Sequence, residues 1–286
     1  MIDLLSRHPG VFIACVLILG VLVGSFINVL AWRLPKMLEQ DWQAQARDLL
    51  GLPEPAKGPV YNLMRPRSHC PHCQHSLRAR ENIPLLSYLF LRGKCSQCKT
   101  AISLRYPFTE LTCAALSAFV AWHFGFGAQA GWMLVLTWGL LAICLIDAEH
   151  QIVPDMLVFP LLWLGLLLNS FEVFTTLPQA VWGAALGYAC LWGIFWLFKL
   201  FTGMDGMGYG DFKLLAMLGA WGGVAILPLT VVLSSLLGAL VGLSLLGLRR
   251  AKTSTPIPFA PYLAIAGWIA LLWGGQITDF YWQLSV

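Results

Sequence analysis

The sequence has few charged residues for its length. Only 11% of its 286 residues are Asp, Glu, Lys or Arg, whereas 58% are apolar. A soluble domain usually carries about a quarter charged residues. This scarcity of charge excludes an ordinary soluble protein and indicates an integral membrane protein.

A recognisable signal-peptidase site is also missing. The first apolar run, residues 11–32, is long enough to span a membrane, and no A-x-A pattern stands directly after it. We therefore expect this run to be a retained transmembrane helix.

The later apolar segments predict further transmembrane helices. They cover residues 108–124, 130–146, 152–171, 177–200, 212–222, 224–248 and 260–275. The last part of this series needs a break, because residues 212–248 as one helix would measure roughly 55 Å against a membrane core of about 30 Å. Gly222, Gly223 and Pro228 offer that break. The predicted fold is an all-α polytopic membrane protein with about eight transmembrane helices.

Lys and Arg are absent from every second turn between these segments. The loop of residues 33–107 holds 12 of the 18 Lys and Arg, whereas the turns at 125–130, 171–176 and 222–228 hold none. Basic loops stay on the cytosolic side of a membrane, so we expect the 33–107 loop to be cytosolic. Aromatic residues are sparse between its basic ones, and we expect no nucleic-acid partner.

These patterns divide the chain into three parts. Residues 1–32 form the first transmembrane helix, 33–107 the cytosolic loop, and 108–286 the remaining transmembrane domain. Within the loop, a short amphipathic helix near residues 39–50 and a solvated linker are both compatible with the sequence.

Four of the eight cysteines form two C-x2-C pairs in the cytosolic loop. Cys70 and Cys73 are separated by 21 residues from Cys95 and Cys98. This spacing is typical of a zinc ribbon, in which each pair supplies two thiolates to a tetrahedral ion. Four thiolates leave no open position on the metal, so the zinc is expected to be structural.

Three histidines surround the first cysteine pair. His69, His72 and His75 are each able to replace one cysteine as a ligand, or to lie in solvent beside the metal. The other four cysteines stand singly in apolar segments, where cysteine packs as a small apolar side chain. They are Cys15, Cys113, Cys144 and Cys190.

Six carboxylates lie at predicted cytosolic helix edges, where ionisable groups indicate function. They are Glu110, Asp147, Glu149, Asp155, Asp205 and Asp211. Two aspartates that converge on one water share a proton, and this is the chemistry of an aspartic protease. Asp211 is favoured because "GYGD" leads directly into a helix. Its partner among Asp147, Glu149, Asp155 and Asp205 stays open at this point. The alternative for each acid is contact with lipid headgroups or a helix N-cap, and Asp155 and Glu110 suit the cap.

Several motifs resemble those of one known family. "GYGD" (208–211) resembles the G-x-G-D signature of intramembrane aspartic proteases, and "LIDAEHQIVPD" (145–155) resembles the other acidic turn of the type IV prepilin peptidases. Further family motifs follow in order along the chain. They are "GSFINVLAWRLP", "RSHCPHC" through "NIPLLSYLFLRGKCSQC", "SLRYPFTEL" and "PIPFAP".

The resemblance implies an activity and a pair of catalytic residues. By position, the two catalytic aspartates of the family correspond to Asp147 and Asp211, while Asp155 and Asp205 match acids around the site. Members of the family cleave the basic leader of prepilins and pseudopilins after a glycine, at the cytosolic face of the bacterial inner membrane. Those with the long zinc-ribbon loop also N-methylate the new N-terminal residue with S-adenosylmethionine. Membrane lipid is the expected surrounding of the chain.

The methyl donor has no recognisable site in the sequence. The loop lacks a glycine-rich strand-to-helix turn, and position alone nominates Glu81, Arg92, Gly93 and Lys94. Lys213, two residues after Asp211, either biases which aspartate ionises or anchors the helix at the membrane surface. Two alternatives stay open: a peptidase without methylation, and a transporter with a zinc-ribbon accessory whose carboxylates relay protons.

Overall fold

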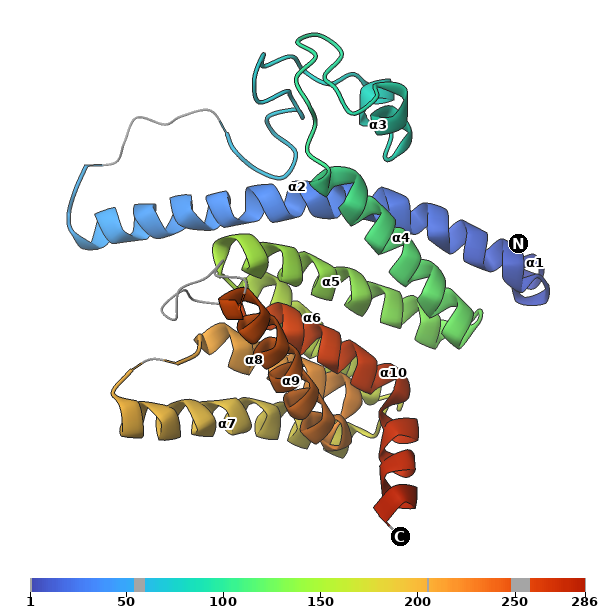
Figure 1. Ribbon diagram of the computed structural model, residues 1–286, viewed down its shortest axis with the longest axis vertical. Helices are drawn as coiled ribbons and strands as arrows, with labels where there is room; N and C mark the ends of the chain where they lie inside the picture. Colours follow the sequence, from blue (N-terminus) through green and yellow to red (C-terminus); the bar gives the residue numbers. More distant parts are fainter. Residues whose placement is uncertain (1, 54–59, 205, 248–257, 286) are drawn as a thin grey trace. The chain divides into compact units, whose positions relative to one another are not determined.

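The computed structural model describes residues 2–53, 60–204, 206–247 and 258–285. Within these ranges the chain is helical, and its only extended pairings are two isolated bridges (Figure 1). The elements are α1 (Ile2–Arg7), α2 (Pro9–Leu49), η1 (Ala79–Asn82), α3 (Leu86–Phe90), α4 (Arg105–Phe124), α5 (Ala128–His150), α6 (Asp155–Asn169), α7 (Leu177–Thr202), α8 (Tyr209–Gly222), η2 (Val224–Ile226), α9 (Leu227–Gly247) and α10 (Ala260–Ser285).

The predicted all-α class is confirmed, and a helix occupies each of the eight predicted segments. The predicted break near residue 222 is present at Gly223, whose φ of +76° suits glycine. Five helices of the described chain are long and apolar enough to cross a membrane. These helices make the chain a multi-pass membrane protein, while the number of eight spans stays a prediction.

The first long helix ends later than the sequence predicted. α2 continues without interruption from Pro9 to Leu49, through Pro35, and its 41 residues amount to roughly 60 Å of helix. The apolar run stops at Trp32, but backbone hydrogen bonding does not require apolar side chains. The segment near 39–50 is therefore helical, as one of the two alternatives supposed, and it is continuous with the first span.

The chain divides into two compact units, Met1–Ala142 and Ile143–Val286, and the boundary falls inside α5. In the first unit, α2 packs closely on α4 through glycines. A Cβ on Gly20 would lie 2.7 Å from Ser117 Oγ, and one on Gly24 would lie 2.8 Å from Glu110 Cα. Small residues at such crossings allow membrane helices to approach closely.

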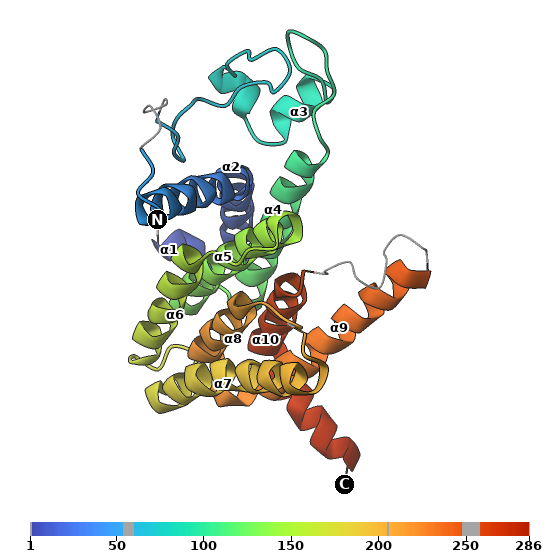
Figure 2. The ribbon, with the colours of Figure 1, turned by 90° about the vertical axis from the view of Figure 1, so that its left-hand side faces the viewer.

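The second unit is built around the short helix α8. Its residues Leu214, Leu215, Met217 and Leu218 are fully buried, and α6, α7 and α10 pack against it. Figure 2 shows α7 running beside α8. A predicted short span is thus enclosed by its neighbours.

Two close contacts fix α8 in this position. Gly183 of α7 and Gly219 of α8 meet backbone to backbone, and a Cβ on either glycine would overlap the other residue. The buried amide of Asn169 donates to the carbonyls of Ala220 and Trp221 at 2.8 and 3.0 Å. These contacts position the helix that begins at "GYGD".

Candidate aspartate site and cysteine ribbon

Asp147 lies in the last turn of α5 and is buried, with 5% of its surface exposed. Its Oδ2 accepts a hydrogen bond from the backbone N–H of Ala260 at 3.2 Å. Ala260 is the first residue of α10, so the donor comes from a helix 113 residues further along the chain.

Asp211 lies in the first turn of α8 and is also buried, at 7% exposed. Gly208 caps the helix with an extended backbone, and the Asp211 N–H donates to its carbonyl at 3.2 Å. The two aspartates lie near enough for their charges to influence one another. The two aspartates are thus buried carboxylates from separate helix ends within one unit.

The two acidic turns touch through Gly210. A Cβ on Gly210 would lie 2.7 Å from the Cβ of Val153, in the segment that follows α5. This glycine is therefore a contact point between the turns. The bend itself belongs to Gly203, which ends α7 with a φ of +70°.

Burial separates Asp147 from the other candidate partners of Asp211. Glu149 and Asp155 are both exposed, and Asp205 lies outside the described residues. Asp155 forms an ion pair with Lys213, whose Nζ lies 2.7 and 2.8 Å from its two carboxylate oxygens. Lys213 thus joins α8 to the start of α6, a role that sequence reasoning did not foresee.

The four loop cysteines form one cluster in the first unit. The Sγ atoms of Cys70, Cys73, Cys95 and Cys98 all lie within 4.8 Å of one another. Two of the separations are 3.7 and 3.9 Å, close to the sulfur spacing of about 3.8 Å that zinc–sulfur bonds of about 2.3 Å give in a tetrahedron. The cluster is able to hold a metal ion.

The two cysteine pairs have the same backbone conformation. We call residues 68–102 the cysteine ribbon. In each half the first cysteine N–H donates to the carbonyl five residues on, His75 or Thr100, at 2.9 Å. Gln74 and Lys99 follow the pairs with the same φ of 59°. This repeated turn aims both pairs at a common point.

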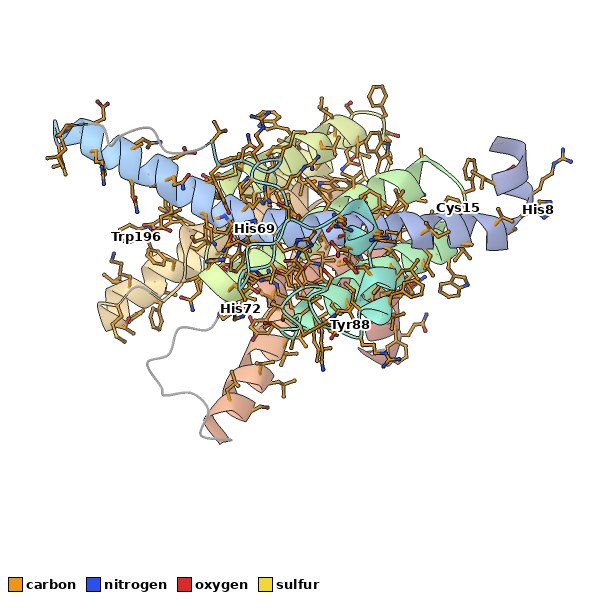
Figure 3. The ribbon with its side chains drawn as sticks, turned by 90° about the horizontal axis from the view of Figure 1, so that it is seen from above. His8, Cys15, His69, His72, Tyr88 and Trp196 are labelled. Carbon is orange, nitrogen blue, oxygen red and sulfur yellow. The ribbon has the colours of Figure 1, made fainter. Side chains whose placement is uncertain are left out.

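Two of the three nearby histidines have other partners. His75 Nε2 lies 3.3 Å from Glu81 Oε2, and His69 Nδ1 lies 2.9 Å from the Arg67 carbonyl. Figure 3 labels His69 and His72 in the ribbon, and Cys15 lies well away from them on α2. The geometry therefore favours the four cysteines as the ligand set.

Of the four residues nominated for the methyl donor, Glu81 is already engaged. The backbone N–H of Arg78 donates to the Glu81 carboxylate at 2.8 Å. This hydrogen bond, together with those from Ser96 and His75, lowers the pKa of Glu81 to about 2. Glu81 thus braces the two halves of the ribbon.

The other three nominated residues lie together after α3. Arg92 and Lys94 are exposed on either side of the buried Gly93. Gly93 has a φ of +67°, and a Cβ there would lie 2.8 Å from the Tyr88 hydroxyl. Side chains at Gly93 are therefore excluded by both backbone and space.

Sequence reasoning missed the residues that attach the ribbon, and the segment just before it, to the helices of its unit. Arg33 on α2 is buried, and its guanidinium donates to the carbonyls of Asn62, Leu63 and Pro66 at 2.9, 3.2 and 2.6 Å. Glu110 on α4 accepts the Leu85 N–H at 2.7 Å. Neither bond had a signal in the sequence, because the partner in each case is backbone.

Fold and site together define a multi-pass membrane protein with a buried aspartate pair and a ribbon whose four cysteines are able to hold a metal ion. Residues 18–124 match the bacterial peptidase A24 N-terminal domain, and residues 134–243 match the type IV leader peptidase family. The chain belongs to this family of type IV leader peptidases.

Relatives match almost the whole chain. A prepilin leader peptidase/N-methyltransferase from Pseudomonas aeruginosa is 62% identical over 285 residues, covering 100% of this chain and 98% of the relative. Proteins of the same name from Stutzerimonas stutzeri and Dichelobacter nodosus are 60% and 48% identical over 284 residues, with 97% or more of each chain covered. No solved structure matches the chain.

Proposed function

We propose that this protein cleaves the basic leader of type IV prepilins and pseudopilins after a glycine and then N-methylates the new N-terminus. The observation that carries the proposal is the buried pair Asp147 and Asp211 in a chain matched end to end by prepilin leader peptidase/N-methyltransferases. Buried carboxylates at helix ends of a membrane protein are costly and therefore indicate function.

The aspartates supply acid and base for hydrolysis. One carboxylate takes a proton from water as the water oxygen bonds to the scissile carbonyl carbon, and the other carboxyl gives its proton to the carbonyl oxygen. When the carbon–nitrogen bond breaks, the first group returns its proton to the leaving amine. The second regains its proton as the carbonyl reforms.

The cytosolic face of the membrane is the proposed place of the reaction. The basic excess in residues 33–107 supports a cytosolic ribbon and active site. The leader–helix junction of a prepilin lies at such a surface, within reach of carboxylates at helix ends. Lipid surrounds the apolar helices, and no nucleic-acid partner is proposed.

The ribbon is the proposed site for zinc and, nearby, for methylation. Cys70, Cys73, Cys95 and Cys98 would hold one structural zinc, because four thiolates close its coordination. S-adenosylmethionine would supply the methyl group. Arg92, Gly93 and Lys94 stay its candidate contacts, whereas Glu81 is better assigned to bracing the ribbon.

The test of cleavage compares three aspartates in detergent-solubilised enzyme with a prepilin substrate. We expect Asp147→Asn and Asp211→Asn each to reduce cleavage by roughly 1000-fold or more. Asp155→Asn is the matched control, because Asp155 is exposed at the same pair of turns. If both buried variants still cleave, the protease proposal fails.

Mass spectrometry of the mature pilin tests the second step. We expect its N-terminal residue to carry one added methyl group when S-adenosylmethionine is present. A cleaved but unmodified pilin would reduce the protein to a peptidase alone.

A further inference from the structure

The first turn of α10 has one backbone N–H that its own helix does not use. The carbonyl of Phe259 accepts hydrogen bonds from the N–H groups of Tyr262 and Leu263 at 3.1 and 3.2 Å. Pro261 has no N–H. Among residues 260–263, Ala260 is therefore the one whose backbone N–H is present and does not donate to the Phe259 carbonyl.

The Ala260 N–H donates its hydrogen bond to Asp147 instead. Ala260 N lies 3.2 Å from Asp147 Oδ2. Ala260 is fully buried and Asp147 nearly so. Where water is excluded, a hydrogen bond of this kind holds a carboxylate in place and favours its charged form.

The geometry points to Ala260 as a positioning residue that makes Asp147 the ionised member of the pair. This inference rests on the proposed function and deepens it. Asp147 then takes the proton of the attacking water, and Asp211 gives its proton to the substrate carbonyl oxygen. The Asp211 carboxylate has a main-chain partner within its own turn, Gly208, whereas the donor to Asp147 comes from another helix 113 residues further along the chain, which no side-chain motif reveals.

A purely structural cap is the competing explanation. Asp147 would then serve only to satisfy the start of α10, as acidic side chains do at helix N-termini. Loss of the bond would loosen α10 and reduce substrate binding and stability along with turnover. Loss of a positioning bond would reduce turnover alone.

Ala260→Pro removes the N–H and adds the proline ring at a buried position. Proline is well tolerated as the first residue of a helix, where its φ already fits. Ala260→Val adds a side chain of comparable size and keeps the donor, so it is the matched control. We expect Ala260→Pro to have a kcat for prepilin cleavage about 10- to 100-fold below that of Ala260→Val, since the lost bond is to a charged group.

Three further readouts separate positioning from damage. The KM for prepilin, the thermal stability and the methylation of an already cleaved pilin should be equal in the two variants. Equal, measurable kcat values in Ala260→Pro and Ala260→Val, or a KM that rises in Ala260→Pro alone, would overturn the inference.

An ester linkage between residues 259 and 260 resolves the case in which crowding inactivates both variants. It replaces the N–H by oxygen without added bulk, and the same 10- to 100-fold loss of kcat is expected. Unchanged turnover of the ester would overturn the inference. Failure of the proposed function looks different, because Asp147→Asn itself would then still cleave prepilin.

Discussion

The cysteine ribbon and the aspartate pair are held in place by different means. In the ribbon, Cys73 and Cys98 are exposed, and few apolar side chains are buried beside them. Asp211 lies in the first turn of a helix whose residues 214–221 are all buried. A small segment with little core needs a metal to stay folded, whereas helix packing and buried hydrogen bonds position the aspartates.

Removing a ribbon cysteine should therefore unfold the cysteine ribbon and leave the aspartate pair in place. We expect Cys70→Ser or Cys98→Ser to abolish zinc binding and to reduce methylation by more than about tenfold, with a smaller loss of cleavage. Metal analysis and the two activity assays on one preparation measure this. Cys15→Ser is the control, because Cys15 lies on α2, away from the cluster. Equal loss of both activities would show that the ribbon supports the whole enzyme.

Crowding the α7–α8 contact should have the opposite effect. Gly183→Ala places a methyl group against the backbone of Gly219, and such overpacking costs about 1–3 kcal/mol. We expect a lower melting temperature and reduced cleavage with full zinc content. Gly193→Ala, on the same helix with open space around it, should leave the melting temperature equal or higher. Equal effects of the two substitutions would contradict the packing explanation.

The ion pair between Lys213 and Asp155 should matter much less. Asp155 is half-exposed, at 52%, so solvent screens the pair and its contribution is below about 1 kcal/mol. We expect Lys213→Gln to retain cleavage within about threefold of wild type, with a small coupling to Asp155→Asn in a double-mutant cycle. Complete loss of cleavage in Lys213→Gln would instead place that lysine in the catalytic machinery.

The smallest expected effect is a pH dependence confined to the ribbon. Glu81 has a folded pKa of about 2, below its ordinary 4.5, chiefly because it accepts the Arg78 N–H. Its stabilising contribution is complete above pH 4.5 and disappears as the pH falls toward 2. Hydrogen exchange of residues 78–82 should therefore differ between wild type and Glu81→Gln near neutral pH and converge in acid. A difference that grows in acid would contradict this sign.

The positions of most helices were predictable, because each depends on the length of an apolar run in the sequence. The segment 177–200 corresponds to α7 (Leu177–Thr202), and the glycine break falls at Gly223 as expected. The predicted end of the first helix, at Trp32, was wrong, because the helix hydrogen bonds of α2 continue into the polar residues that follow. Side-chain chemistry likewise predicted the cysteine cluster.

The supporting contacts of both regions were not predictable, for one physical reason. The Ala260 N–H that reaches Asp147 and the carbonyls that accept from Arg33 are main-chain groups. Every residue except proline has such an N–H, so residue type says nothing about which one is used. The folded structure alone determines which main-chain group meets each side chain.

The most direct test of separate regions is Asp211→Asn assayed for both reactions on one preparation. We predict that prepilin cleavage falls by roughly 1000-fold or more, while methylation of an already cleaved pilin and the zinc content match wild type. Persistent cleavage, or loss of methylation together with cleavage in a folded, zinc-loaded variant, would contradict the account.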